Sequence, residues 1–373
     1  MVTKKKVFWK IWIVLIIATL LLIIPGFFPA FCDWYTDNIY GILCDGISKV
    51  TCRVPFAIGE MIMYLGAILI VGAVIILVVL VFLRKSKGYR RFCRIYFKTI
   101  LMIFTCIVLW YMPTWYIPFR GSVLGVGERE VRTSFTNAEL ETLITYIVEG
   151  ANAAAEEIEV EEDGTVIFPM GDESRSLIDK AMTNLSSEYP RLNGFYPPMK
   201  VALCSDILER MDIGGYNYPF SMEPTCNKYL SPLGRYIIET HELSHHKGYY
   251  KENEGNFLSE LALVKSDNPY LRLSGYLDMY YWVMQDYKKS IGTNSEPEAK
   301  FSERVTKIKS ASYAIKKEIY DADSHPIDEM PKVEKVITKT SDKGWEIQGD
   351  ILQENSYDGV TLLLLQYYDG KIY

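Results

Sequence analysis

Three long apolar runs in the first third of the chain constrain its fold more than any other feature. They lie at about residues 7–28, 55–83 and 97–117. Each run is long enough to cross roughly 30 Å of hydrocarbon as an α-helix, which takes about 20 apolar residues. Inside a bilayer the backbone must satisfy its own hydrogen bonds, so such runs are helical there. We therefore expect residues 1–119 to form a membrane α-helical part with three transmembrane helices in the lipid bilayer.

Basic residues at the ends of these runs predict the orientation. The N-terminus and the second connection contain only basic charges: Lys4, Lys5, Lys6, Lys10, Arg84, Lys85, Lys87, Arg90, Arg91 and Arg94. The first connection, residues 29–54, has two basic residues against three aspartates. Since cytoplasmic loops carry the excess of Lys and Arg, we expect a multi-pass cell-membrane protein with a cytoplasmic N-terminus. Three crossings then place residues 120–373 outside the cytoplasm.

Composition excludes some other classes of site. The formal net charge of −6 and the pI of about 5.5 argue against nucleic acid as a partner. No C-x-x-C pair occurs, which argues against a zinc site built from cysteines. Cys204 and Cys226 both fall in the expected outside domain, where a disulfide between them could persist.

Residues 120–373 have the composition of a globular domain with its own core. Apolar periodicity predicts mainly helices: from Thr136 onward, and at about 173–187, 233–247, 251–264 and 271–287. Residues 199–204 are expected to form a short buried strand. A second strand, at about 221–229, is expected at an edge, because Pro224 cannot donate to a ladder. The run at 360–368 fits a strand or a helix. These elements predict a mainly helical α+β domain.

The helix expected at 233–247 carries the arrangement H-E-x-x-H. On a helix, His241 and His245 are one turn apart on one face, a spacing at which two imidazoles can bind one Zn²⁺. Glu242 is then placed to act as the general base that activates a water. Gly248 suits the position after a helix end, so the next helix can return toward the histidines and supply a third ligand.

Two glutamates are candidates for that third ligand. Glu252 shares a helix face with Asn256, so one could bind the metal and the other support it. Glu254 points roughly the opposite way and remains the alternative. His246 projects about 100° away from His245 and is a weak ligand candidate. We expect His241, His245 and Glu252 as the metal ligands and Glu242 as the catalytic base.

Four stretches resemble a family of uncharacterised bacterial membrane proteins. They are L-G-V-G-E-R-E-V at 124–131, S-M-E-P-T-C-N at 221–227, H-E-L-S-H-H-K-G-Y-Y-K-E-N-E-G-N-F at 241–257 and S-Y-D-G-V-T-L-L-L-L-Q-Y-Y at 356–368. Proteins of that family have short N-terminal spans followed by a zincin-like domain. The resemblance implies the same layout here and brings no settled activity.

The residues after the histidines are also similar to a wider group. The run Glu252-x-x-Gly255-Asn256 is similar to the E-x-x-A-D or E-x-x-A-N signature of gluzincin peptidases. In that signature the first Glu is the third zinc ligand, which implies this role for Glu252. The interval from His245 to Glu252 is much shorter than in most gluzincins. It is similar to the metzincin turn H-E-x-x-H-x-x-G-x-x-H, with Lys251 in the place of the last His.

Together these patterns predict a membrane-anchored zinc metallopeptidase that cleaves a peptide or protein substrate outside the cytoplasm. One alternative is a catalytically inactive, zinc-stabilised binding or sensory domain. Another is a zinc hydrolase that acts on a different cell-envelope amide. An oxyanion donor could come from a tyrosine at 276–287 or from Tyr357.

Overall fold

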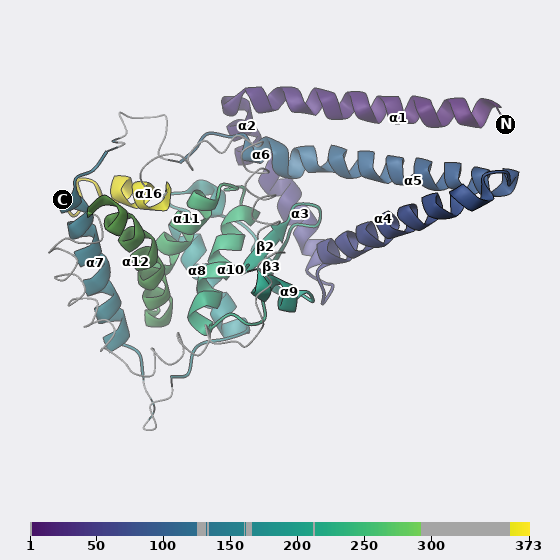
Figure 1. The fold of residues 1–373 in the computed structure, drawn as a ribbon. Helices are drawn as coiled ribbons and strands as arrows, with labels where there is room; N and C mark the ends of the chain where they lie inside the picture. Colours follow the sequence, from purple (N-terminus) through teal and green to yellow (C-terminus); the bar gives the residue numbers. More distant parts are fainter. Residues whose placement is uncertain are drawn as a thin grey trace. The chain divides into compact units, whose positions relative to one another are not determined.

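The computed structural model describes residues 2–124, 132, 134–159, 161, 166–211, 213–291 and 359–373 (Figure 1). The chain divides into two compact units. Unit 1 comprises Met1–Ser122 together with Tyr218–Glu223. Unit 2 comprises Val123–Asn217 and Pro224–Tyr373.

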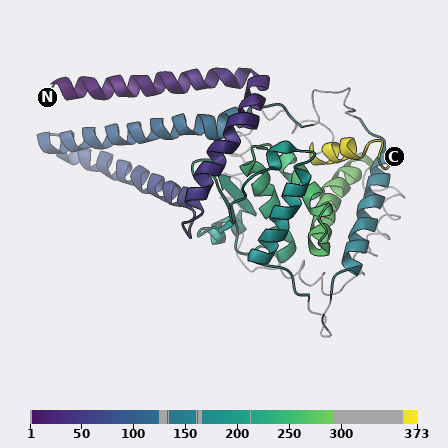
Figure 2. The same cartoon turned by 180° about the vertical axis from the view of Figure 1, so that it is seen from behind.

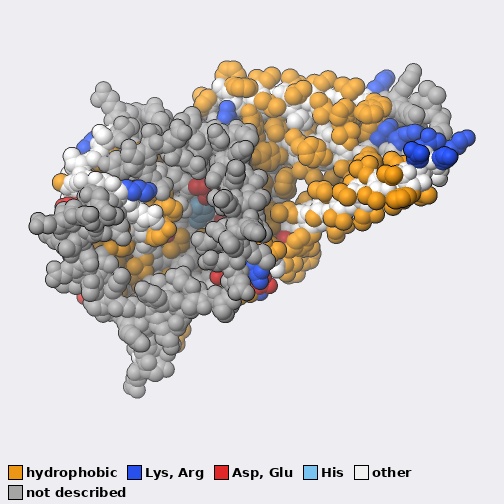
Figure 3. Space-filling view, in the orientation of Figure 1, with side chains coloured by type: hydrophobic (Ala, Val, Ile, Leu, Met, Phe, Trp, Pro, Cys, Tyr) orange, Lys and Arg blue, Asp and Glu red, His pale blue; other side chains and the backbone are white. Residues whose placement is uncertain are grey.

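Unit 1 contains three helices that are long and apolar enough to cross a membrane, at Val7–Phe27, Ile58–Leu83 and Lys87–Phe119. They correspond to α1 (Val2–Ile23) with the 3₁₀ turn η1 (Ile24–Phe27), α4 (Ile58–Leu83) and α5 (Lys87–Tyr111). In the space-filling view, orange apolar side chains cover these helices and blue basic ones gather where α4 meets α5 (Figure 3). The expected apolar helices are confirmed, and they indicate a membrane protein.

The third span begins earlier than its apolar run. α5 begins at Lys87 rather than near residue 97, because Ser86 caps the helix by accepting a hydrogen bond from Tyr89 N at 3.3 Å. The charged first turns therefore extend the helix without adding apolar length. Short helical segments complete unit 1: α2 (Pro29–Tyr35), η2 (Thr36–Tyr40), α3 (Gly41–Thr51), η3 (Met112–Tyr116) and α6 (Ile117–Phe119).

Residues 218–223 are held within unit 1 by hydrogen bonds. Trp110 Nε1 donates to the carbonyl of Phe220 at 3.1 Å, and Thr51 Oγ1 donates to the carbonyl of Ser221 at 3.0 Å. Glu223 Oε2 accepts from Gly59 N at 2.9 Å. Since Gly59 lies at the start of α4 and Trp110 near the end of α5, this segment is fixed to the ends of two spans.

Unit 2 is built mainly from helices, as the sequence predicts. They are α7 (Asn137–Glu156), α8 (Asp172–Leu185), η4 (Pro190–Leu192), α9 (Ser205–Arg210), α10 (Pro232–His246), α11 (Glu252–Val264), α12 (Pro269–Ile291) and α16 (Gly359–Tyr368). The predicted start at Thr136 is confirmed by a capping box. Thr136 Oγ1 accepts from Glu139 N at 3.3 Å, while Glu139 Oε2 accepts from Thr136 N at 2.7 Å.

The core of unit 2 lies between these helices. α12 packs beside α7, as the two opposite views of the molecule show (Figures 1 and 2). A Cβ at Gly150 of α7 would lie 2.3 Å from the ring of Tyr276, so glycine permits this close approach. α11 packs against α8, α10, α12 and α16. Because other helices surround it, nearly every residue from Glu254 to Val264 is buried.

The sheet differs from the predicted one. Its order is β1 (Lys200–Val201), β3 (Glu223–Cys226), β2 (Gly215–Tyr218). β1 and β3 are parallel, with Lys200 opposite Thr225 and Val201 opposite Cys226. The expectation of an edge strand at 221–229 is wrong, because Pro224 precedes the residues that pair with β1. β3 is the central strand of the described sheet, and β1 and β2 are its edges; the sequence did not indicate β2.

The structure also tests three smaller expectations from the sequence. The strand predicted at 199–204 shrinks to the two residues of β1, and Val201 is 43% exposed rather than buried. No disulfide joins Cys204 to Cys226 in this structure, so the bridge considered between them does not form. The run at 360–368 is helical, in α16. Tyr357 lies outside the described residues.

Candidate metal centre

The helix that carries the histidines has well-defined ends. Ser231 Oγ accepts a hydrogen bond from Gly234 N at 3.1 Å and caps the start of α10. At the other end Gly248 N bonds the carbonyl of His245 at 2.9 Å, and Tyr249 N bonds the carbonyl of Ser244 at 3.2 Å. This pair of bonds is a Schellman motif, and Gly248 adopts φ 90° as the motif requires. The chain then reverses into α11 after only five residues.

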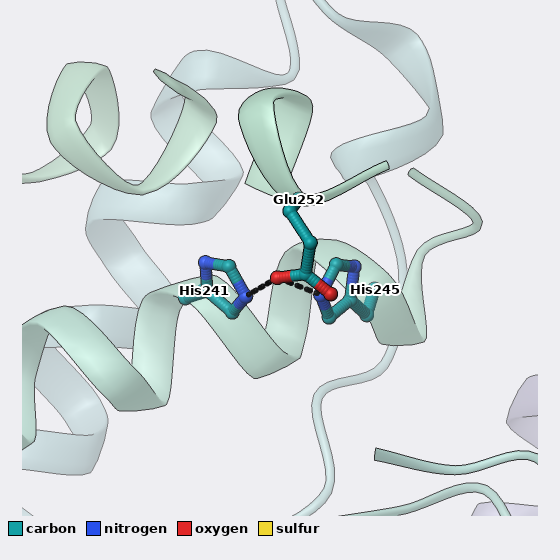
Figure 4. Close-up of side chains that lie close together, drawn as sticks. All are labelled: His241, His245 and Glu252. Atoms are coloured by element: carbon teal, nitrogen blue, oxygen red, sulfur yellow. Dashed lines mark ion pairs between the residues drawn. The ribbon is translucent and has the colours of Figure 1, made fainter. Parts of the chain in front are cut away.

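The reversal brings Glu252 to both histidines (Figure 4). Its Oε2 lies 3.2 Å from His241 Nε2 and 3.7 Å from His245 Nε2. One ligand atom from each of the three residues lies within 4.8 Å of the others. Among the described residues, no other group of three or more His, Cys, Asp or Glu side chains converges in this way. The structure thus unites the three residues that the sequence selected as metal ligands.

The three side chains differ in exposure. His241 and His245 are buried, at 8% and 4% exposed, whereas the side chain of Glu252 is 49% exposed. Histidine atoms nevertheless remain visible from outside the molecule (Figure 3). The group is therefore anchored in the core of unit 2 and reaches solvent through Glu252.

The hydrogen bonding of His245 fixes its tautomer. Its Nδ1 lies 2.7 Å from the carbonyl oxygen of Tyr249. Because a carbonyl can only accept, Nδ1 carries a hydrogen and Nε2 is the atom that faces Glu252. Metal-binding histidines usually donate their second N–H to such an acceptor. The Schellman turn thus also orients the ring, because it positions Tyr249.

The charges of this group shift one another's pKa. Burial would raise the pKa of Glu252, but the two imidazoles hold it well below its usual range. Burial would lower the pKa of His245, but the charge and hydrogen bond of Glu252, the charge of Glu242 and the Tyr249 carbonyl raise it to about 9. At neutral pH the group is therefore an imidazolium–carboxylate pair, in which a proton lies where a cation would bind.

Gly255 sets the distance between α10 and α11. A Cβ at this position would lie 2.9 Å from His241 Cε1 and 3.1 Å from His245 Cε1. Since real Cβ atoms almost never approach that closely, any other residue would push the rings or the helix away. A glycine inside a helix costs about 1 kcal/mol relative to alanine. A glycine inside a predicted helix was therefore a sequence signal of close packing at this position. The sequence comparison used Gly255 only as a substitute for the alanine in the E-x-x-A-D or E-x-x-A-N signature.

The other candidate ligands lie elsewhere. Glu254 is buried, and its Oε1 accepts a hydrogen bond from Leu124 N at 2.8 Å, so it supports the segment that enters unit 2. His246 is fully buried, and burial lowers its pKa well below the usual value. Asn256 lies on α11 and is half-buried. The choice of Glu252 over Glu254 agrees with these positions.

Glu242 lies beside the metal candidates and the sheet. It is 3% exposed, and burial raises its pKa to about 7, against the opposing charges of His241 and His245. Its Oε1 is 3.1 Å from the position that a Cβ of Gly215 would take, so the edge strand β2 passes directly beside the carboxyl. Its Oε2 has no hydrogen-bond partner among the described residues. A buried carboxyl with this pKa can both accept and return a proton near neutral pH.

Sequence reasoning missed a pair of carboxyl groups, Glu260 and Asp278, of which Asp278 interacts electrostatically with His241. Burial raises the pKa of Glu260 on α11 well above its usual value, and the charge of Asp278 on α12 adds to the effect. The pKa of Asp278 is raised to about 6 by burial, although the charge of His241 opposes this. The pair therefore holds at least one proton at neutral pH. The sequence signal that could have revealed this pair is Glu260, an acid among the apolar residues of α11.

The aromatic helix α12 serves the core where its contacts are described. Tyr276 packs against Tyr146 and Gly150 of α7, and the hydroxyl of Tyr287 donates to Glu141 at 2.8 Å. A tyrosine ring that does contact the metal candidates is that of Tyr250, which is buried and stacks on His245 with centroids 6.2 Å apart. Neither Tyr276 nor Tyr287 is placed to stabilise an oxyanion at the histidines.

Comparison with known proteins places the chain in a family. One family model, described as Protein of unknown function (DUF3810), matches residues 35–365. The chain belongs to the DUF3810 family. The match covers most of the chain and includes His241, Glu242, His245 and Glu252. No curated protein and no solved structure matches the chain. DUF3810 membership confirms the resemblance to an uncharacterised family and assigns no activity.

If His241, His245 and Glu252 bind zinc, replacing Gly255 with alanine should weaken that binding. The new Cβ would displace the two histidine rings, so we expect zinc affinity to fall at least about tenfold, as when the support of a ligand is lost. Competition with a chromogenic chelator measures the change. Gly234→Ala is the matched control, because its Cβ would meet only the Ser231 hydroxyl, at 3.1 Å. Equal zinc affinity in Gly255→Ala and the wild type would show that the close approach is not needed.

If this group binds zinc, its zinc affinity should rise with pH. The pKa of His245 is about 9, so below this pH zinc must displace a proton from the imidazole. With one proton released, the apparent affinity increases about tenfold per pH unit up to that value. Calorimetric titration in buffers of different ionisation enthalpy measures both the affinity and the protons released. A constant affinity from about pH 7 to about pH 8.5, with no proton release, would contradict this account.

Proposed function

We propose that the chain is a membrane-anchored zinc metallopeptidase whose unit 2 is a zincin-like domain. The observation that carries this proposal is the convergence of His241 Nε2, His245 Nε2 and a Glu252 carboxylate oxygen beside Glu242. The order of these residues along α10 and α11 supports the zincin-like layout, since both helices contribute to one site across a short turn.

The donor set fits zinc better than the common alternatives. Two imidazole nitrogens and one carboxylate are a ligand set of catalytic zinc sites, which keep a fourth position open for water or substrate. Magnesium and calcium prefer all-oxygen sites. The half-exposed side chain of Glu252 supports an open position on its side of the group.

Zinc held there would polarise a substrate carbonyl and lower the pKa of a water. Glu242 then supplies the proton transfers: its carboxylate takes a proton from the attacking water and returns it to the nitrogen of the leaving amine. The pKa of Glu242, near 7, suits both transfers. The Tyr249 carbonyl keeps His245 in the tautomer that leaves Nε2 free to bind.

The edge strand favours a peptide substrate. β2 passes Glu242 at Gly215. Among the described strands, only β3 pairs with β2, so no described strand pairs with the other edge of β2. An extended peptide can add to such an edge through main-chain hydrogen bonds. This would align a peptide bond with the carboxyl of Glu242, an arrangement that a substrate without extended backbone would not use.

We further propose that unit 2 faces away from the cytoplasm. The basic residues near the N-terminus and between α4 and α5 support this orientation, because such clusters stay on the cytoplasmic side. Three spans then carry the chain outside before unit 2 begins. The substrates would be peptides or proteins of the cell envelope or its surroundings.

Substitution of Glu242 should separate zinc binding from catalysis. In the full-length protein we expect Glu242→Gln to retain about one zinc per chain and to lose peptide cleavage by at least about 10²-fold. His241→Ala should lose both, because it removes a ligand. Elemental analysis gives the zinc content, and mass spectrometry of a digested peptide library gives the cleavage.

The remaining outcomes identify the alternatives. Equal cleavage by Glu242→Gln and the wild type would refute the general-base role. Zinc binding without cleavage of any peptide would favour a zinc-stabilised binding or sensory domain. Activity only on non-peptide envelope amides would favour a different hydrolase. If the wild type binds no zinc, the metal site itself is wrong.

The orientation has its own test. Alkaline phosphatase fused after Tyr373 should be active, because it folds only outside the cytoplasm, and green fluorescent protein at the same position should stay dark. Paired fusions in the connection between α4 and α5 should give the reverse pattern, since those basic residues remain inside. A fluorescent fusion after Tyr373 would place unit 2 in the cytoplasm.

A further inference from the structure

The connection between the first two spans is a continuous helical rod that belongs to unit 1. α2, η2 and α3 follow one another without a break from Pro29 to Thr51. Both ribbon views show them running from the end of α1 to the start of α4 (Figures 1 and 2). We call this stretch the α2–α3 rod. At 1.5 Å per residue it is about 35 Å long.

Short pieces of chain tie both ends of the rod to spans of the same unit. The rod begins two residues after Phe27, where the first span ends, and stops seven residues before Ile58, where the second begins. The turn that follows it is tight, since Val54 N bonds the carbonyl of Thr51 at 3.0 Å. Because one crossing ends and the next begins at these points, both ends of the rod lie at the same face of the bilayer.

Hydrogen bonds place the rod beside the ends of the spans rather than beyond them. Cys32 Sγ donates to the carbonyl of Pro25 at 3.3 Å, two residues before the first span ends. The hydroxyl of Tyr35 donates to the carbonyl of Pro113 at 3.0 Å, six residues before the third span ends at Phe119. Six residues are roughly 9 Å of helix. Since the polar layer outside the hydrocarbon is about 5–8 Å thick, contacts this far along a span bring the rod to the level of the headgroups.

One side of the rod is buried in unit 1. Its buried residues recur every four positions, at Cys32, Thr36, Tyr40, Cys44 and Ser48. In an uninterrupted α-helix this spacing would drift by about 40° at each step, or about 160° along the rod. The π turn η2 inserts one residue, which offsets about 100° of that drift. The π turn therefore lets α2 and α3 bury the same side.

In α2 the exposed surface separates apolar from acidic residues. Trp34 is 51% exposed and lies on the side opposite the buried residues. At 100° per residue, Phe31 lies about 60° to one side of Trp34, and Asp33 lies about 100° to the other. Phe31 is exposed, whereas Asp33 Oδ1 accepts a hydrogen bond from Ser122 N at 2.9 Å. The rod therefore has an apolar edge and an acidic edge.

α3 repeats this order in the same rotational sense. Ile42 is 78% exposed and takes the place that Trp34 has in α2. Val50, which is 64% exposed, lies about 80° from Ile42 on the apolar side, and Asp45 lies about 60° from it on the acidic side. The apolar edge of the rod comprises Phe31, Trp34, Ile42 and Val50.

The apolar edge continues the exposed apolar surface of the first span. Phe27 and Phe28 at the junction are both exposed, and Phe31 N bonds the carbonyl of Phe28 at 2.9 Å. Tryptophan near the end of a span is typical of the headgroup layer. Because the opposite edge carries acids, attraction to anionic lipid does not hold the rod at the bilayer. The contact has to be apolar.

We propose that the α2–α3 rod lies along the headgroup region of the phospholipid bilayer, with Trp34 and Ile42 in contact with lipid and Asp45 toward water. A lipid surface is the occupant because both ends of the rod, and the contacts of α2, are fixed to spans of the same unit. An amphipathic helix in this position buries its apolar side about 5–10 Å into the boundary between headgroups and acyl chains. This placement does not depend on zinc or on peptidase activity.

Photo-cross-linking in the full-length protein tests the proposal. p-Benzoylphenylalanine replaces Ile42 or, as the matched control, Gly41. Gly41 is also exposed, lies about 100° from Ile42 on the acidic side, and has no described atom within 4 Å of an added Cβ. The protein is placed in phosphatidylcholine nanodiscs, irradiated and analysed by mass spectrometry. We expect lipid adducts at position 42 in several-fold excess over position 41.

A second variant tests the apolar edge as a whole. Trp34→Asp should reduce the lipid adducts at position 42 several-fold, because a charge on the apolar edge opposes its insertion. Each variant should elute as one species in size-exclusion chromatography, since the altered residues are exposed. Val50, on the same edge, serves as the probe position if the substitution at Ile42 prevents folding.

Three outcomes would overturn the proposal. Equal lipid adducts at positions 42 and 41 would mean that the apolar edge is not the side that faces lipid. Adducts at position 42 to a second copy of the chain would mean that this edge is a protein interface. The absence of any adduct at position 42 and at position 50 would mean that the edge faces water.

Discussion

The candidate metal centre depends on the close approach of two helices. Gly255 lets α11 lie against the rings of His241 and His245 where any Cβ would collide with them. Gly248 reverses the chain so that Glu252 arrives at the first turn of the second helix. Glycine is thus used once for backbone conformation and once for space. Gly255 costs helix stability because it lies inside α11, whereas Gly248 lies after the end of α10, where glycine is favoured.

The same packing buries Glu254 and Glu260 but leaves the side chain of Glu252 about half-exposed, and each acid is compensated differently. Glu254 is satisfied by a backbone amide, whereas Glu260 and Asp278 keep a proton between them. Glu252 alone relies on imidazolium charge, which makes it the acid most responsive to a bound cation. An unpaired charge in such a core would cost several kcal/mol. The arrangement therefore favours either a proton on His245 or a metal ion bound in place of that proton.

Local patterns in the sequence sufficed for the helices and not for the sheet. The capping box at Thr136 and the turn at Gly248 are determined by neighbouring residues, so the sequence revealed them. Strand order depends on non-local pairing, and Pro224 was misread because its place in the ladder depends on where β1 ends. The candidate ligands were found from their spacing. The role of Gly255 was not predicted, because it depends on how closely α11 packs against α10.

The segment that joins β2 to β3 is held by hydrogen bonds within unit 1. β2 and β3 belong to the sheet beside Glu242, yet the residues that join them are bonded to Thr51, Gly59 and Trp110. Met222 in this joint has φ 52°, a conformation that a non-glycine residue holds only when its surroundings enforce it. Without residues 1–122 those hydrogen bonds would be lost and this strain would be free to relax. The strand β2, which passes beside Glu242 at Gly215, ends at Tyr218, the first residue of this segment of unit 1.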